Sequence, residues 1–159
     1  MKAKLDKKSQ EILGVDDLVI IVEKVDDVAL LIGQMMKMGL QEVRDKHIPR
    51  HWKQRELSWG WTAVIWLAYI LSEGDHRNIS VRSYITGMQN TLSQVTGQKI
   101  EPLDFTDDRL GCLLKSLSKS KYWHKIEKEM NEKTIKIYRL KENKTLYSVM
   151  LRLFQATIK

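Results

Sequence analysis

One run of the chain restricts the fold more than any other: residues 58–72, SWGWTAVIWLAYILS, contain no charged side chain. Apolar residues fall on every face of a helix drawn over this run, and Ser58 is a suitable N-cap. A helix that is apolar all round is buried on all sides. The run is shorter than the roughly twenty residues needed to cross a bilayer. It therefore predicts the central helix of a compact domain and no membrane partner.

Amphipathic patterns on both sides of this run predict helices that pack around it. Before it, Asp26 and Asp27 are expected to cap a helix whose apolar positions continue at helical spacing up to a stop at Gly39. A short second helix follows, and Pro49 ends it near Ile48. After it, one amphipathic helix is predicted over residues 81–95, one from the cap at Thr106 to residue 117, and one after a break at 118–120.

Two other stretches have the composition of strands. Residues 18–22 (LVIIV) form a short apolar run, and residues 134–140 (TIKIYRL) alternate and are rich in β-branched side chains. We expect these two stretches to pair as a minor two-stranded ribbon. The predicted fold class is thus mainly α, a compact multi-helix domain around the helix at 58–72 with this ribbon as a minor addition.

The positive charge of the chain is confined to its last third. The net charge is +7; residues 1–114 hold 15 Lys and Arg against 16 Asp and Glu, whereas residues 115–159 hold 12 against 4. A localised excess indicates a polyanion partner, nucleic acid first, more strongly than a solubility charge would. The alternative is a solvated lysine-rich helix face. The single cysteine, Cys112, and the polar N-terminus without an apolar signal core predict a cytoplasmic protein.

The last predicted helix carries the candidate DNA-binding residues. Lys121, Lys125 and Lys128 recur at i, i+4 and i+7 and so share one face, with Lys119 and Lys133 near its two ends. Lysine supplies charge without bidentate base recognition, so phosphate contacts are better supported than sequence reading. We expect an i, i+4 pair of Lys125 with Glu129 to neutralise part of this face.

The sequence contains no pattern typical of a metal or catalytic site. The possible soft ligands do not cluster: His47, His51, His76, His124 and Cys112. Capping and loop solvation account for the carboxylates that a two-metal nuclease would recruit: Glu73, Asp75, Asp104, Asp107 and Asp108. The eight glycines are dispersed, without a phosphate-binding loop. We therefore expect no metal, no cofactor and no small-molecule substrate.

Three stretches resemble a known family. VDDVALLIGQMMKMGLQEVRDKHIPRHW, LSWGWTAVIWLAYILSEGDHR and LDFTDDRLGCLLKSL, in this order within residues 15–145, are similar to the N-terminal region of DDE-type transposases of bacterial insertion sequences. LSWGW, LSEGDHR and DFTDDRL are distinctive together. The resemblance implies a helical domain of unknown function that precedes an RNase H-like catalytic domain, and so a DNA-associated role.

The C-terminal residues depart from this family. The family continues into a catalytic strand with an Asp-x-Thr-Thr type motif, but no Asp or Glu follows Glu142 here. We expect a basic flexible tail at 1–14, the helical transposase domain at 15–145, and a truncated or frameshifted strand remnant at 146–159. The resemblance then implies no catalytic residue and no enzyme activity, with DNA and full-length transposase of the same family as partners.

Two other functions remain open at this point. The chain could be a protein-interaction module whose apolar residues 147–158 dock on a transposase catalytic domain, or a small self-contained nuclease. Binding to DNA phosphates should weaken steeply with salt, whereas apolar docking should not.

Overall fold

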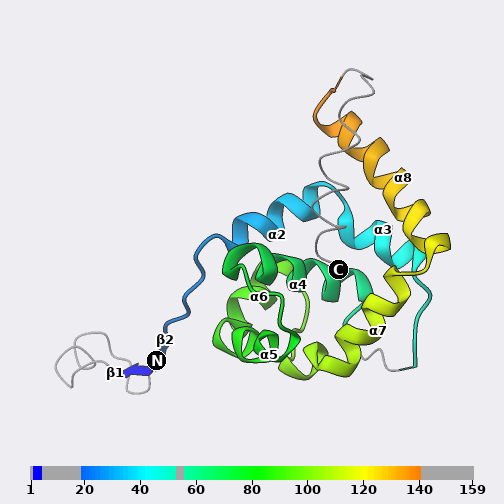
Figure 1. Cartoon of the computed structure of the whole chain (residues 1–159). Coiled ribbons are helices and arrows are strands. Elements are labelled where there is room, and N and C mark those ends of the chain that lie inside the picture. The colour runs from blue at the N-terminus through cyan, green and yellow to red at the C-terminus, as the bar shows by residue number, and fades with distance from the viewer. Residues whose placement is uncertain (1, 5–18, 53–55, 141–159) are drawn as a thin grey trace.

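The computed structural model describes residues 2–4, 19–52 and 56–140, with side chains described from residue 22 onward. The fold is mainly helical, as predicted (Figure 1). Along the chain the elements are β1 (Lys2–Lys4), β2 (Val19–Ile21), α2 (Val28–Lys37), α3 (Leu40–His47), α4 (Trp59–Glu73), α5 (Asn78–Gly87), α6 (Gln89–Thr96), the 3-10 helix η1 (Pro102–Phe105), α7 (Asp107–Leu117) and α8 (Ser120–Ile137).

Helix α4 is the centre of the core, which confirms the prediction for residues 58–72. Nine of its fifteen residues are buried, among them Trp59 and Trp66. The Ser58 hydroxyl accepts a hydrogen bond from the Trp61 N–H at 3.2 Å and so caps the helix. At the other end Gly74 adopts a left-handed backbone with φ 63°, which favours glycine.

Helices α2 and α3 pack against α4, as the amphipathic patterns predict. α3 approaches so closely that a Cβ on Gly60 would lie 2.1 Å from the Gln41 carbonyl oxygen. Asp45 of α3 holds the start of α4, because its carboxylate accepts hydrogen bonds from the Gly60 N–H at 2.7 Å and the Ser58 hydroxyl at 2.6 Å. The glycine therefore sets the spacing of the two helices.

The boundaries of α2 and α3 agree with those expected from the sequence, and only the capping of α2 differs. Gly39, with φ 66°, separates α2 from α3, and α3 ends at His47, just before Ile48 and Pro49. Asp27 precedes α2 but makes no side-chain cap; its carboxylate instead accepts from the Ser72 hydroxyl of α4 at 2.6 Å. The Asp27 side chain, expected to cap α2, thus makes a tertiary contact instead.

The single helix predicted over residues 81–95 is wrong, because the chain forms two helices there. Met88, with φ −140° and ψ 28°, separates α5 from α6. Gly87, a poor helix former, precedes the break. The break keeps the Met88 side chain in the core and lets α6 pack against α2. Helical spacing of apolar residues alone does not reveal such a change of direction.

The predicted ribbon is also wrong in its pairing. Residues 134–137 form the last turn of α8, whereas β2, within the predicted stretch 18–22, pairs antiparallel with β1, Lys2 opposite Ile21. β1 lies inside the predicted N-terminal tail at 1–14. A short stretch of alternating apolar and polar residues can also form the end of a helix. Contact with the body outweighs β propensity here, since the neighbouring Tyr138 is hydrogen-bonded to Gln34 of α2. The predicted remnant at 146–159 lies outside the described residues.

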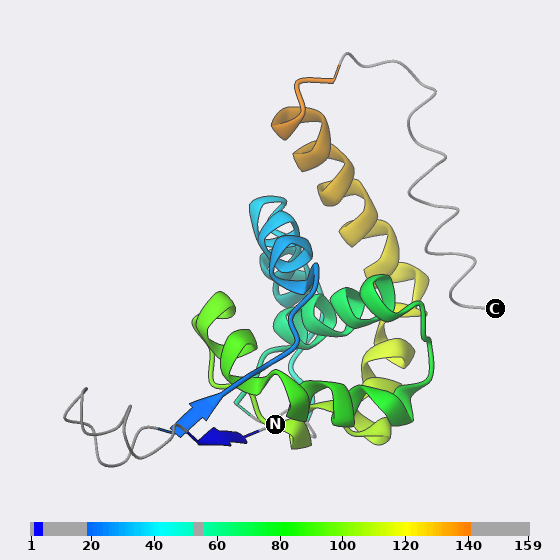
Figure 2. The same ribbon diagram turned by 90° about the vertical axis from the view of Figure 1, so that its left-hand side faces the viewer.

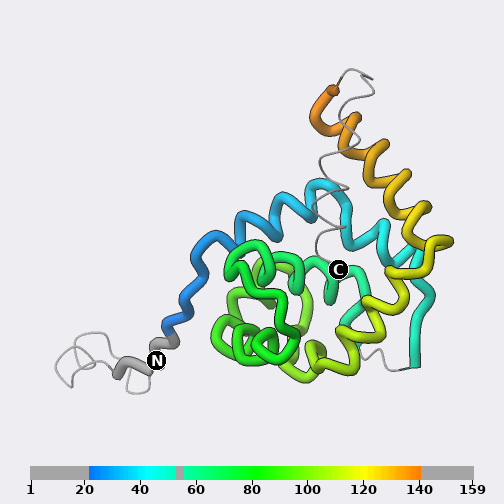
Figure 3. Tube along the Cα trace, viewed as in Figure 1, coloured from blue at the N-terminus to red at the C-terminus, as the bar shows by residue number. Residues whose placement is uncertain are grey.

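Helix α8 extends away from the body. The chain turns between α7 and α8 (Figure 3), and the C-terminal end of α8 stands apart from α5 and α6 in both Figure 1 and Figure 2. α8 packs against α3 and α7. Among helices of the described residues, none combines the length and apolarity needed to span a bilayer.

Candidate nucleic-acid interface

A small apolar contact positions α8 on the body. Ile126 is the one buried residue of this eighteen-residue helix, and Met130 is partly buried against the same core. The helix begins at Ser120, directly after the predicted break at 118–120. Ten residues of α8, Met130 included, are half-buried, and its seven exposed residues, which include Lys125 and Glu132, are available to a ligand.

Four lysines form an exposed stripe along α8, which we call the lysine stripe: Lys121, Lys125, Lys128 and Lys136. Their spacing of i, i+4, i+7 and i+15 keeps them on one side of the helix over about 22 Å, at a rise of roughly 1.5 Å per residue. Glu132 is the acidic residue on the same side. Within the described residues, no carboxylate pairs with Lys121, Lys125 or Lys128. Three of the five predicted lysines are therefore exposed on one face.

The other two predicted lysines lie off this stripe. Lys119 is exposed at the N-cap, with its ammonium 5.7 Å from the centre of the Tyr122 ring. Lys133 is half-buried and reaches toward α3, where its ammonium pairs with the Glu42 carboxylate at 3.3 Å. Lys133 is thus partly neutralised and is a weaker candidate than the sequence pattern suggests.

Glu129 does not pair with Lys125, contrary to the expectation from i, i+4 spacing. Its Oε2 atom instead accepts from the Lys46 ammonium at 2.9 Å and lies 2.8 Å from the His47 Nε2 atom, both on α3. Lys46, and to a smaller extent His47, lowers the pKa of the Glu129 carboxyl below its ordinary value. This cross-helix contact leaves Lys125 without a neutralising partner among the described residues.

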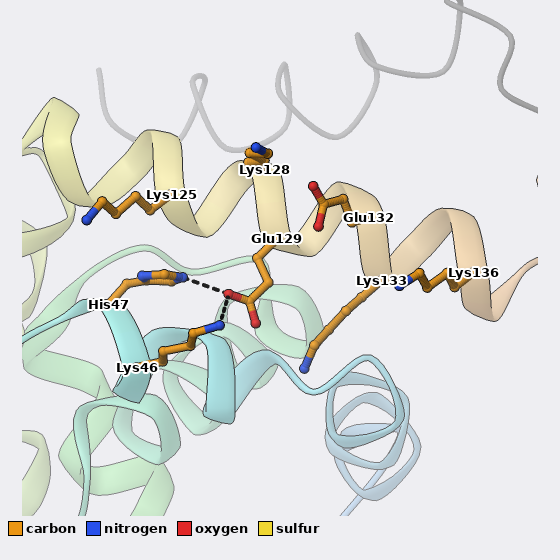
Figure 4. A pocket seen from close by; sticks show the side chains of 8 residues that line it. All are labelled: Lys46, His47, Lys125, Lys128, Glu129, Glu132, Lys133 and Lys136. Carbon is orange, nitrogen blue, oxygen red and sulfur yellow. Dashed lines mark hydrogen bonds and ion pairs between the residues drawn. The ribbon is translucent and has the colours of Figure 1, made fainter.

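A groove separates α8 from the end of α3, and we call it the α3–α8 groove. Its volume is about 540 Å³. Figure 4 shows Lys46 and His47 reaching from α3 toward Glu129, Lys133 reaching toward α3, and Lys128 and Glu132 directed away from α3. The lining consists of Lys46, His47, Lys125, Lys128, Glu129, Glu132, Lys133 and Lys136.

Three of the lysine and histidine residues in this lining were not singled out as DNA contacts from the sequence: Lys46, His47 and Lys136. Lys136 falls in the stretch expected to be a strand; with the helix extended to residue 137, its spacing would have placed it beside Lys128. Lys46 and His47 face α8 only because α3 packs beside it. No sequence signal brings those two elements together.

Two of the carboxylates considered for catalysis, Asp75 and Asp104, make contacts that hold the fold together. Asp104 is buried and pairs with Arg109 at 2.8 Å, and Asp75 binds Arg77 and accepts from the Tyr69 hydroxyl at 2.7 Å. The Arg77 guanidinium, followed by Tyr69, holds the pKa of Asp75 well below its usual range. No group of three or more His, Cys, Asp or Glu residues in the described ranges is arranged to hold a metal ion.

Arg44 is a buried cation outside the groove. Its guanidinium is almost fully covered, and burial lowers its pKa to about 10. The Nε and Nη1 atoms have no hydrogen-bond partner among the described residues. Arg44 does not line the groove, so it adds no ligand-binding atom to the interface.

Comparisons with protein-family models, with curated proteins and with solved structures find no match to this chain.

Proposed function

We propose that this chain is the N-terminal helical domain of an insertion-sequence transposase and associates with DNA without cleaving it. The observation that carries the DNA role is the lysine stripe of α8, four exposed lysines on one side of a helix that packs on the body through α3 and α7. A DNA strand carries one phosphate per roughly 3.4 Å of helix axis, so a stripe of about 22 Å meets several phosphates.

The chemistry of the stripe favours backbone contacts over base recognition. Lysine is a compact point charge, whereas specific base contacts in the major groove most often use the bidentate guanidinium of arginine. Helix α8 contains no arginine. Binding should accordingly be modest in affinity and nearly independent of DNA sequence, with most of its free energy coming from counterion release.

The stretches that resemble transposases have a different role in this fold. LSEGDHR forms the end of α4 and the turn in which Asp75 binds Arg77, and DFTDDRL contains the buried pair of Asp104 and Arg109. Both stretches hold the helices of the body in place. The family proposal thus rests on residues that build the domain, and the DNA proposal rests on α8.

A salt titration tests the DNA role. Changing Lys121, Lys125 and Lys128 to glutamine keeps a helix former and removes three charges, so the slope of log affinity against log salt should flatten by up to about 3 units. A variant with Lys24, Lys37 and Lys99 changed to glutamine loses the same charge away from α8 and is the matched control. An equal effect of both variants, at unchanged helical content, would remove the stripe as the binding site.

The two alternative functions have distinct outcomes. Large exposed apolar side chains that could dock on a protein lie apart along the chain: Leu30 on α2, Trp52 in the segment after α3, and Ile79 on α5. Binding to a transposase catalytic domain that persists at high salt would favour the interaction module. Metal-dependent cleavage of a plasmid by the purified chain would establish a nuclease and overturn the non-catalytic proposal.

A further inference from the structure

We propose that the α3–α8 groove is a second phosphate site of the same DNA interface, and that the Glu129 carboxylate occupies this site in the structure. The inference rests on the proposed DNA association and extends it from the lysine stripe to two residues of α3, Lys46 and His47. The ligand group is a phosphate of the DNA backbone.

The first support is the contact geometry of Glu129. A single oxygen, Oε2, lies 2.9 Å from the Lys46 ammonium and 2.8 Å from the His47 Nε2 atom. Charge-assisted hydrogen bonds to phosphate oxygens have the same length, about 2.7–2.9 Å. The two donors therefore already converge on the position that one phosphate oxygen would take.

The second support is the charge of the groove. Five lysines line it against two glutamates, Glu129 and Glu132, and Glu132 is directed away from α3 (Figure 4). Glu129 is thus the carboxylate that compensates Lys46 and His47 inside the groove. All eight side chains that line the groove are lysine, glutamate or histidine, unlike the mostly apolar residues that line small-molecule sites. An anion is the ligand that fits such a lining.

The third support is continuity with the stripe. Lys125, Lys128 and Lys136 belong both to the lysine stripe and to the groove lining. Lys128 is directed away from α3 (Figure 4), so a DNA backbone that follows the stripe borders the outer edge of the groove, where the Lys46 side chain is largely exposed, at 64%. When the Glu129 side chain turns toward solvent, a phosphate can take its place between Lys46 and His47.

An ordinary structural ion pair between α3 and α8 is the competing explanation of the same contact. The two explanations differ in what Lys46 does once Glu129 is neutral. As a structural partner, Lys46 has no effect on DNA affinity beyond its general charge. As a phosphate ligand held by Glu129, it contributes little net affinity in the wild type, because a phosphate bound there displaces the Glu129 carboxylate, and it contributes a full contact when that carboxylate is removed.

A double-mutant cycle with Glu129→Gln and Lys46→Gln separates these explanations. Affinity for a labelled random-sequence duplex is measured by fluorescence anisotropy at several salt concentrations and constant pH. We expect Glu129→Gln to bind roughly fivefold to tenfold more tightly near 0.1 M salt, with a salt slope steeper by about 1 unit, since one phosphate contact contributes about 0.9. Lys46→Gln should change the wild-type slope little and abolish this gain.

Glu132→Gln is the matched control, because it neutralises a carboxylate of the same helix that does not contact Lys46. Its gain in affinity should be the same with and without Lys46→Gln. An equal loss from Lys46→Gln in the wild type, Glu129→Gln and Glu132→Gln backgrounds would overturn the groove site while leaving the stripe intact. Absence of duplex binding by both the wild type and Glu129→Gln would overturn the DNA proposal as well.

A measurement on the wild type keeps the inference testable if a variant fails to fold. The His47 ring signals in NMR should shift when duplex is added, because phosphate replaces Glu129 at Nε2, and the exposed His76 ring, in the turn between α4 and α5, serves as the reference. Unchanged His47 signals at saturating duplex would overturn the proposal.

Discussion

Helices α4 and α8 differ in how much of their surface is buried. α4 buries nine of fifteen residues, whereas α8 buries only Ile126 of eighteen. α4 has apolar side chains all round and holds the body together, while α8 has a narrow apolar contact and four exposed lysines. The comparison shows that stability and the candidate interface lie on different helices. Changes to the lysines of α8 should therefore alter binding without unfolding the domain.

The largest effect should come from truncating the core of α4. Trp66 is 7% exposed, and Trp66→Ala should lower the free energy of unfolding by about 3–5 kcal/mol because it leaves a cavity at the centre. Leu71→Ala on the same helix is the control, since Leu71 is 56% exposed and its loss should be within about 1 kcal/mol. Urea denaturation of both variants makes the comparison, and equal losses would contradict the central position of Trp66.

A smaller and more local loss of stability is expected from shortening Ile126, the buried residue through which α8 packs on the body. Ile126→Ala should lower stability by about 2 kcal/mol, near the lower end for buried aliphatic truncations, because α8 covers little other apolar surface. Amide hydrogen exchange should accelerate along α8 and stay slow in α4. Uniform acceleration in both helices would show that α8 unfolds only with the body.

The smallest effect concerns the pH dependence of the contact between α8 and α3. The pKa of Glu129 is lowered in the folded chain, so its contribution is present above the unfolded pKa and is lost as pH falls through the folded pKa. Glu129→Gln should be less stable than the wild type by no more than about 1 kcal/mol near neutral pH. Thermal melts should converge as the solution is acidified below the ordinary glutamate range, and a constant difference across pH would contradict the assigned cause.

Much of the fold was predictable because its signals are local. The uncharged run at 58–72 led to α4, Gly39 and Pro49 marked the limits of α2 and α3, and the apolar spacing after Thr106 led to α7. The break at Met88 and the helical state of residues 134–137 were not predictable in the same way. Both depend on which parts of the fold cover the segment. The spacing of apolar residues along the chain does not reveal those tertiary contacts.

The candidate site likewise has features that the spacing within one helix predicts and features that depend on tertiary contacts. Spacing alone placed Lys121, Lys125 and Lys128 on one face, since a helix fixes the angle between residues by sequence separation. The same rule assigned Glu129 to Lys125, and there it failed. Folding brings two partners on α3, Lys46 and His47, close to the Glu129 carboxylate. They compete for this carboxylate more effectively than the flexible Lys125 on the same helix.

The sequence by itself determined the central helix, the helical class and the local faces of each helix, because these follow from hydrophobic period and backbone geometry within one segment. The tertiary structure decided which faces meet. It brought Lys46 and His47, more than eighty residues from Glu129 along the chain, to the same carboxylate oxygen. It also turned Lys133 toward Glu42 and left the lysine stripe exposed, because charge pairs form between groups that packing brings close in space, whatever their separation in sequence.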